Sequence, residues 1–130
     1  MYIRLDPHSG EPLSKQLKER LQYLIVSGAA APGAQIDSVR ALAEKTGVNP
    51  TTVAKVFTQL QMEGYLVMRP GAGAFVAPKP PAYTAGEKKR RLREALRPAL
   101  VEARFLGMDA DDIVAVVHDE LTKLAGDAHD

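Results

Sequence analysis

The chain has 130 residues, of which 45% are apolar and 25% charged, so it can form one ordinary domain with a small appendage and is not disordered by composition. It contains no cysteine, which excludes disulfides, thiolate zinc sites and cysteine nucleophiles. No apolar run approaches the roughly 20 residues of a membrane-spanning helix, and the first residues lack a signal-peptide pattern. We therefore expect a cytoplasmic protein that does not insert into a membrane.

The formal net charge of +1 is unevenly distributed along the chain. Residues 1–79 carry nine Lys and Arg against six Asp and Glu, whereas residues 80–130 carry eight against ten. Within the second part, residues 87–104 are basic, with seven against three, and residues 105–130 are acidic, with one against seven. This pattern is compatible with a basic face for nucleic acid, and equally with ordinary solvated helix surfaces.

Two helices are predicted in the first part of the chain. Pro12 suits the first turn of a helix, and Gly28 can take the left-handed conformation that ends it. A turn at residues 31–33 leads to Ser38, the expected N-cap of a second, short helix that stops at Gly47. The apolar stripe of the first helix consists of Leu13, Leu17, Leu21, Leu24 and Ile25.

A third helix is predicted directly after this turn, with Asn49 as N-cap and Pro50 as its first residue. Gly64 closes it. Its inward face is apolar and comprises Val53, Val56, Phe57 and Leu60. Its outward positions carry Thr51, Thr52, Lys55, Thr58 and Gln59. A helix with short polar side chains on its exposed first turn is suited to point its N-terminal end at a partner.

A β-hairpin is predicted after the third helix. Residues 65–68 have strand composition, residues 69–73 form the tip, and residues 74–76 return. Helix, turn, helix and hairpin in this order outline a winged helix-turn-helix, a DNA-reading module. The expected fold class is therefore mainly α with a small β-hairpin, followed by a short two-helix tail.

The second part of the chain is predicted to hold a linker and two short helices. Proline-rich residues 77–82 favour extended backbone. Pro98 lies inside the next helical pattern, where it costs about 3 kcal/mol in an ideal helix, so we expect a kink or a break near Arg97. Gly107 stops this segment, and Asp109 can cap the next helix.

Two such helices cannot bury their apolar faces alone, so they must pack on the first domain or on another chain. We expect a winged-helix domain at residues 1–77, a linker at residues 78–86 and a dimerisation tail at residues 87–130. The tail residues predicted to lie in a dimer interface are Leu92, Leu96, Leu100, Val114, Val117, Leu121 and Leu124.

From Pro12 to Val76 the sequence resembles the GntR family of bacterial transcription regulators. The short tail and the Asn49-Pro50 pair resemble its YtrA subfamily, whose tail is a dimerisation element too small for a large effector pocket. The matching pieces are Pro12-Leu13, Pro32-Gly33, Ser38-Val39-Arg40-Ala41-Leu42-Ala43, Gly47-Val48 through Val56, Leu60, Glu63-Gly64 and Gly71-Ala72-Gly73-Ala74-Phe75-Val76.

The resemblance implies a set of DNA-contacting residues on the second helix, the third helix and the wing. Alternatives stay open: Arg40 as an ordinary surface arginine, Asn49 as a helix cap, and the wing residues as a plain turn. The implied residues are Ser38, Arg40, Asn49, Thr51, Thr52, Lys55, Arg69, Gly71 and Gly73.

The chain also departs from the family pattern. Pro50 and Ala54 stand where many relatives carry arginine, Asp37 stands where proline is usual, and Pro70 replaces a basic wing residue. The loss of positive charge predicts weak binding by a monomer. A dimer would make the second contact intramolecular and recover affinity.

We therefore expect a transcription regulator, a repressor that binds a palindromic double-stranded DNA operator as a homodimer, and the subfamily implies control of transport or stress genes. The alternative is a winged-helix protein-interaction adaptor that no longer reads DNA. An enzyme is not expected. The histidines are His8, His118 and His129, of which His118 has no second ligand at metal spacing and His129 is next to the terminus, and no catalytic set is recognisable. We expect neither a cofactor nor a bound metal. A small-molecule or metal-ion effector stays open, and no residue names it.

Overall fold

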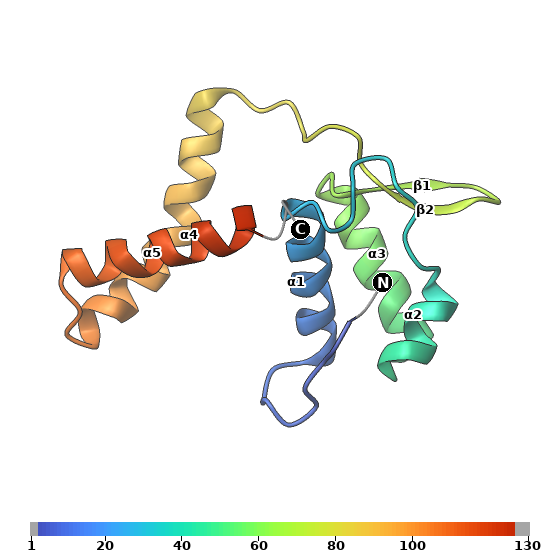
Figure 1. The fold of residues 1–130 in the computed structure, drawn as a ribbon, viewed down its shortest axis with the longest axis horizontal. Helices are drawn as coiled ribbons and strands as arrows, with labels where there is room; N and C mark the ends of the chain where they lie inside the picture. Colours follow the sequence, from blue (N-terminus) through green and yellow to red (C-terminus); the bar gives the residue numbers. More distant parts are fainter. Residues whose placement is uncertain (1–2, 127–130) are drawn as a thin grey trace. The chain divides into compact units, whose positions relative to one another are not determined.

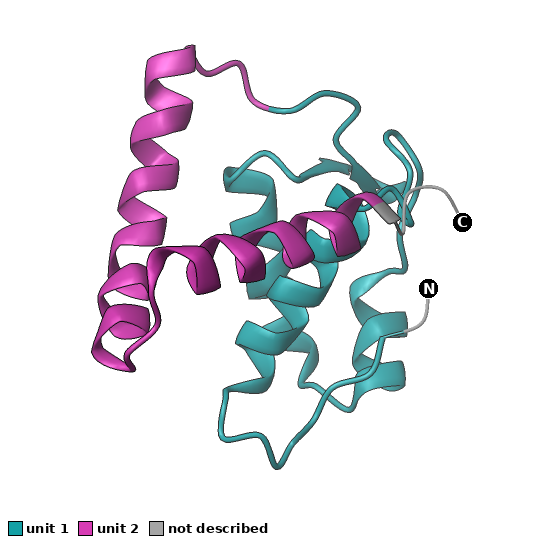
Figure 2. Cartoon of the chain, turned by 60° about the vertical axis from the view of Figure 1, so that its left-hand side comes forward, with its two compact units in different colours: residues 1–80, 127–130 teal, residues 81–126 magenta. Residues whose placement is uncertain are grey.

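The computed structural model describes residues 3–126 and confirms the expected fold class, mainly helical with one antiparallel hairpin (Figure 1). The described residues divide into two compact units, one up to Pro80 and one over Pro81–Gly126 (Figure 2). The elements are α1 (Leu13–Val26), α2 (Val39–Thr46), α3 (Pro50–Met62), β1 (Leu66–Arg69), β2 (Gly73–Val76), α4 (Ala85–Phe105) and α5 (Ala110–Gly126).

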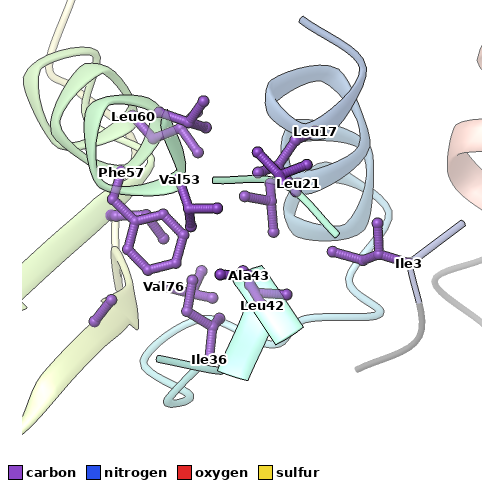
Figure 3. Close-up of a cluster of buried hydrophobic side chains, with 14 residues drawn as sticks. Ile3, Leu17, Leu21, Ile36, Leu42, Ala43, Val53, Phe57, Leu60 and Val76 are labelled. Carbon is purple, nitrogen blue, oxygen red and sulfur yellow. The ribbon is translucent and has the colours of Figure 1, made fainter. Parts of the chain in front are cut away.

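The core of the first unit lies between its three helices and the hairpin. Side chains of α3 converge there with Leu17 and Leu21 of α1 and Leu42 of α2 (Figure 3). The inward residues predicted for α3 are all buried, and Phe57 keeps only 1% of its surface exposed. Burying a side chain of this size stabilises the fold by about 1.5–3 kcal/mol. Because the apolar face of α3 is buried in this core, only its polar face is available to a partner.

The turn between α2 and α3 is defined by caps at both of its ends. The Ser38 hydroxyl accepts a hydrogen bond of 3.0 Å from the Ala41 N–H at the start of α2, and Gly47 ends α2 with a φ of 75°. The Asn49 side chain accepts a bond of 2.8 Å from the Thr51 N–H at the start of α3. These caps confirm the predicted boundaries of α2 and α3. They could be predicted because each cap depends on residues close in sequence.

The hairpin is joined by a third extended segment that the sequence did not predict. β1 and β2 pair antiparallel, with Leu66 opposite Val76. The Ile36 N–H donates to the Ala74 carbonyl at 3.0 Å, and the Val76 N–H donates to the Ala34 carbonyl at 2.8 Å. The wing is thus attached along one edge to the segment that leads into α2.

In the second unit, α4 continues through Pro98 for 21 residues, so of the kink or break expected near Arg97 the break is wrong. Proline removes one N–H donor, and the carbonyl left without it belongs to Glu94, an exposed residue where water can solvate the oxygen. The Thr84 hydroxyl caps this helix, accepting from the Glu87 N–H at 3.1 Å. The Asp109 carboxylate accepts from the Asp112 N–H at 2.9 Å, which confirms the predicted cap of the last helix.

The second unit has no buried side chain among residues 81–125. Large apolar side chains lie open to solvent, among them Leu92, with 59% of its surface exposed, and Val114, with 65%. Within residues 3–126, no helix combines the length and the apolarity needed to cross a bilayer. Two helices with uncovered apolar faces are what the sequence predicts for a tail that cannot form a core alone.

Candidate nucleic-acid interface

The first turns of α3 present a polar surface. Asn49, Thr51 and Lys55 are exposed, whereas Thr52 is half-buried. Lys55 forms no ion pair with any residue in the described range. The N–H groups of a first helical turn and the positive end of the helix dipole favour an anion at this end. This part of α3 therefore offers hydroxyls, an amide and an unpaired ammonium to a negatively charged partner.

The start of α2 contributes a second cation. Arg40 is exposed on the first turn of α2 and has no ion-pair partner among residues 3–126. The neighbouring carboxylate of Asp37 lies 2.7 Å from the Lys45 ammonium. That pair offsets the negative charge that Asp37 adds beside Arg40. The Ser38 hydroxyl accepts the cap bond and keeps its own hydrogen for another acceptor.

The wing carries a cation held against an aromatic ring. The Arg69 guanidinium lies over the Phe75 ring, 4.5 Å from its centroid. Gly71 has a φ of 75° and Gly73 a φ of 115°, conformations that favour glycine. A Cβ at Gly73 would lie 3.0 Å from the Gln35 side-chain nitrogen. The backbone conformation therefore favours glycine at this position, and a side chain there would also displace the end of Gln35.

Gln35 is a residue of this surface that the sequence did not reveal. Its side-chain amide donates a hydrogen bond of 2.6 Å to the Ala72 carbonyl at the wing tip. Because Gln35 lies three residues before Ser38, this bond ties the wing tip to the segment that leads into α2. The partners are 37 residues apart, so no local pattern could have predicted the contact.

A groove of about 490 Å³ lies between α1 and α3. It contains Thr52 and Lys55, two of the residues predicted to contact DNA, together with lysines of α1. Lys15 and Lys18 lie on α1, more than 30 residues before Thr52, so no local sequence pattern could link them to α3. The lining residues are Pro12, Ser14, Lys15, Lys18, Thr52, Lys55, Val56 and Gln59.

The histidines do not form a metal site in the described part of the chain. No group of three or more His, Cys, Asp or Glu side chains within residues 3–126 is placed to hold a metal ion. His8 and His118 are exposed, and His129 lies outside the described residues. The predicted DNA-contacting residues, in contrast, lie together in the first unit, at the starts of α2 and α3 and in the wing.

Comparison with known proteins agrees with this architecture. The model of the family described as bacterial regulatory proteins, gntR family, matches residues 13–76, from the start of α1 to the end of β2. The chain is 26% identical over 125 residues to the HTH-type transcriptional repressor YtrA of Bacillus subtilis, covering 96% of this chain and 93% of that protein. It is 30% identical to the uncharacterized HTH-type transcriptional regulator YhcF of the same organism, covering 82% and 87%.

Solved structures resemble the chain as well. A protein from Listeria monocytogenes EGD-e described as a transcriptional antiterminator matches with a TM-score of 0.83 over 96% of this chain and 92% of that one, and at 23% identity it shows the shared fold alone. The AraR DNA-binding domain in complex with operator ORX1 is 30% identical, with a TM-score of 0.53, over 58% of this chain and 95% of that one.

These relatives are transcription regulators and not enzymes. The YhcF match extends through most of both proteins, and the family match covers the helices and the hairpin of the winged-helix unit. The chain belongs to the GntR family of DNA-binding bacterial transcription regulators.

Proposed function

We propose that this regulator is a repressor that binds a palindromic operator as a homodimer, each protomer placing the first turns of α3 in the major groove of one half-site. The observation that carries the proposal is the exposed polar start of α3, capped by Asn49 and containing Lys55, which has no ion-pair partner among residues 3–126. Similarity to an operator-bound DNA-binding domain supports it. The repressor role is carried over from YtrA, a transcriptional repressor.

The residues of this surface take different roles in the proposal. Thr51, Thr52 and Lys55 face base edges or phosphates, and Arg40 binds a phosphate beside them. Ser38 keeps its cap bond and donates its hydroxyl hydrogen to a phosphate oxygen. At the wing, Gly71 and Gly73 allow close approach of the backbone while Arg69 reaches a phosphate or the minor groove.

The second unit is the dimerisation element in this proposal. α4 carries seven Lys and Arg against three Glu, whereas α5 carries four Asp and Glu against one Lys. A hollow of about 470 Å³ along α4 has Leu96 and Leu100 between Arg93, Arg97 and Arg104. Its apolar floor and basic rim are complementary to the apolar and acidic α5 of a second copy.

Most of the apolar side chains proposed for the interface are exposed in the single chain, which leaves their surface available for burial. Those exposed are Leu92, Leu100, Val114, Val117 and Leu121, and those half-buried are Leu96 and Leu124.

In this proposal residues 1–77 bind DNA, residues 78–86 link the units and residues 87–130 dimerise. Joining two weak DNA-binding units in one dimer raises affinity by about 10²–10⁴-fold when both reach their half-sites.

The cellular setting follows from the same proposal. A bacterial regulator meets its operator in the cytoplasm, where the chromosome lies, and a role in transport or stress genes is implied by the YtrA resemblance. An effector that alters the dimer would change the spacing of the two α3 helices. That spacing must match the distance between the half-sites of a palindromic operator. Family membership favours DNA over the adaptor alternative, in which the winged helix would bind only protein.

A gel-shift titration tests the proposed function. The probes are a duplex from the region upstream of the gene and a scrambled duplex of equal length and composition. We expect tighter binding to the upstream duplex and an affinity that falls steeply with salt. Equal affinity for both duplexes, or binding insensitive to salt, would contradict the proposal.

A further inference from the structure

The groove between α1 and α3 holds two cations that the proposed base-reading surface does not use, beside Lys55, which it does use. Lys15 and Lys18 enter it from α1, and Lys55 enters it from α3. Ser14 and Thr52 add hydroxyl groups from the two helices. Ammonium and hydroxyl groups in one groove are the donors that a phosphate oxygen accepts from.

Both lysines of α1 are held by carboxylates. The Lys15 ammonium lies 3.2 Å from a Glu11 oxygen and 3.9 Å from a Glu19 oxygen. The Lys18 ammonium lies 2.6 Å from a Glu63 oxygen at the end of α3. The lysine side chains keep 54% and 26% of their surface exposed, so solvent screens these ion pairs and a phosphate can compete for the ammonium groups.

We infer that this groove is a second phosphate-binding site, which takes the DNA backbone flanking the bases reached by α3, and that Glu11, Glu19 and Glu63 hold its affinity down. The inference rests on the proposed function, because the DNA backbone in the groove belongs to the same duplex that α3 reads. Continuity supports this occupant, since Thr52 and Lys55 belong both to the groove and to the exposed start of α3.

The carboxylates have a consequence for specificity. A contact between lysine and phosphate carries no sequence information, so it strengthens binding to operator and to other DNA alike. Carboxylates that occupy the lysines therefore lower the affinity for all DNA. Removing one of them raises affinity for both kinds of DNA without improving discrimination between them.

The test compares Lys15→Gln, Lys18→Gln and Glu63→Gln in the full chain, on the upstream duplex and on the scrambled duplex, over a series of salt concentrations. Each lysine variant is expected to weaken binding to both duplexes by a similar factor, about two- to five-fold. It should also make the dependence of log affinity on log salt less steep, reducing the magnitude of the negative slope by about 0.9. Glu63→Gln should tighten binding to both duplexes.

Arg20→Gln is the matched control, because Arg20 is exposed on the same helix but does not line the groove. It removes the same charge and should leave the salt slope unchanged. Thermal unfolding of every variant checks that each one folds. If the wild type binds no DNA, the proposed function and this inference fall together. If the wild type binds and the lysine variants behave like Arg20→Gln, only this inference is overturned.

A second measurement does not depend on the variants. Duplexes are shortened stepwise at the flanks of the half-sites. When the base pairs whose phosphates reach the groove are removed, binding should become weaker and its dependence on salt less steep. Lys15→Gln and Lys18→Gln should lose less on the same shortening. An identical loss for wild type and both variants would contradict a backbone site in the groove.

Discussion

The side-chain amide of Gln35 and the main-chain carbonyl of Ala72 are joined by a hydrogen bond of 2.6 Å, which ties the tip of the wing to the segment before α2. The wing is therefore held from outside its own two strands. We predict that Gln35→Ala leaves thermal stability within about 0.5–1.5 kcal/mol of wild type, because only one exposed hydrogen bond is lost. Affinity for the upstream duplex should fall, and amide exchange at residues 69–73 should become faster. Unchanged exchange at the wing would contradict this role.

The two wing glycines should differ when changed to alanine. Gly71→Ala places a Cβ in open space, so it costs only the left-handed backbone conformation, about 1–2 kcal/mol. Gly73→Ala is strained by its own backbone φ of 115° and adds a contact of 3.0 Å with the Gln35 nitrogen, which must shift by a few tenths of an ångström and so weakens its bond to Ala72. In a Gln35→Ala background the part of the cost of Gly73→Ala that comes from this contact should disappear, whereas the backbone strain at Gly73 remains. Urea unfolding of the single and double variants measures this coupling, and simple additivity would contradict the contact.

Two substitutions at Asn49 separate helix capping from DNA binding. Asn49→Ala removes the side-chain acceptor from the Thr51 N–H and should destabilise the fold by about 0.5–2 kcal/mol. Asn49→Asp keeps an acceptor and should retain stability, yet it puts a negative charge where phosphates approach. We expect Asn49→Asp to unfold like wild type and to bind DNA much more weakly. Retained DNA affinity in this variant would leave Asn49 as a cap alone.

The dimer proposal predicts a separation of assembly from half-site binding. Leu100→Asp should raise the dissociation constant of the dimer by about 100-fold or more, since burial of a leucine contributes about 1.5–3 kcal/mol in each protomer. Sedimentation velocity measures this change. Affinity for a full palindrome should fall with it, whereas affinity for a single half-site should stay constant.

Leu100→Arg is the companion variant, because an arginine is compatible with an acidic α5 of the partner. It should disrupt the dimer less than Leu100→Asp does. The opposite order would contradict the charge complementarity of α4 and α5. Dimerisation unaffected by either substitution would move the interface away from the hollow that Leu96 and Leu100 line.

The sequence predicted those parts of the fold that depend on neighbouring residues. Ser38, Gly47 and Asn49 defined the ends of α2 and α3, because caps involve atoms two or three residues away. The contact of Gln35 with Ala72 and the ion pair of Lys18 with Glu63 join distant segments, so no local signal could reveal them. Pro98 does not break α4, because an exposed helix can lose one hydrogen-bond donor and continue.

The central claim is that the start of α3 reads an operator while Arg40 holds it in register through a phosphate contact. It is tested most directly by fluorescence anisotropy with wild type and the double variant Arg40→Ala, Lys55→Ala, on the upstream and the scrambled duplex at one fixed salt concentration. We predict that the wild type prefers the upstream duplex at least about 10³-fold. The double variant should lose most of this preference while its fold and its dimer persist. A double variant that keeps the wild-type preference would contradict the account.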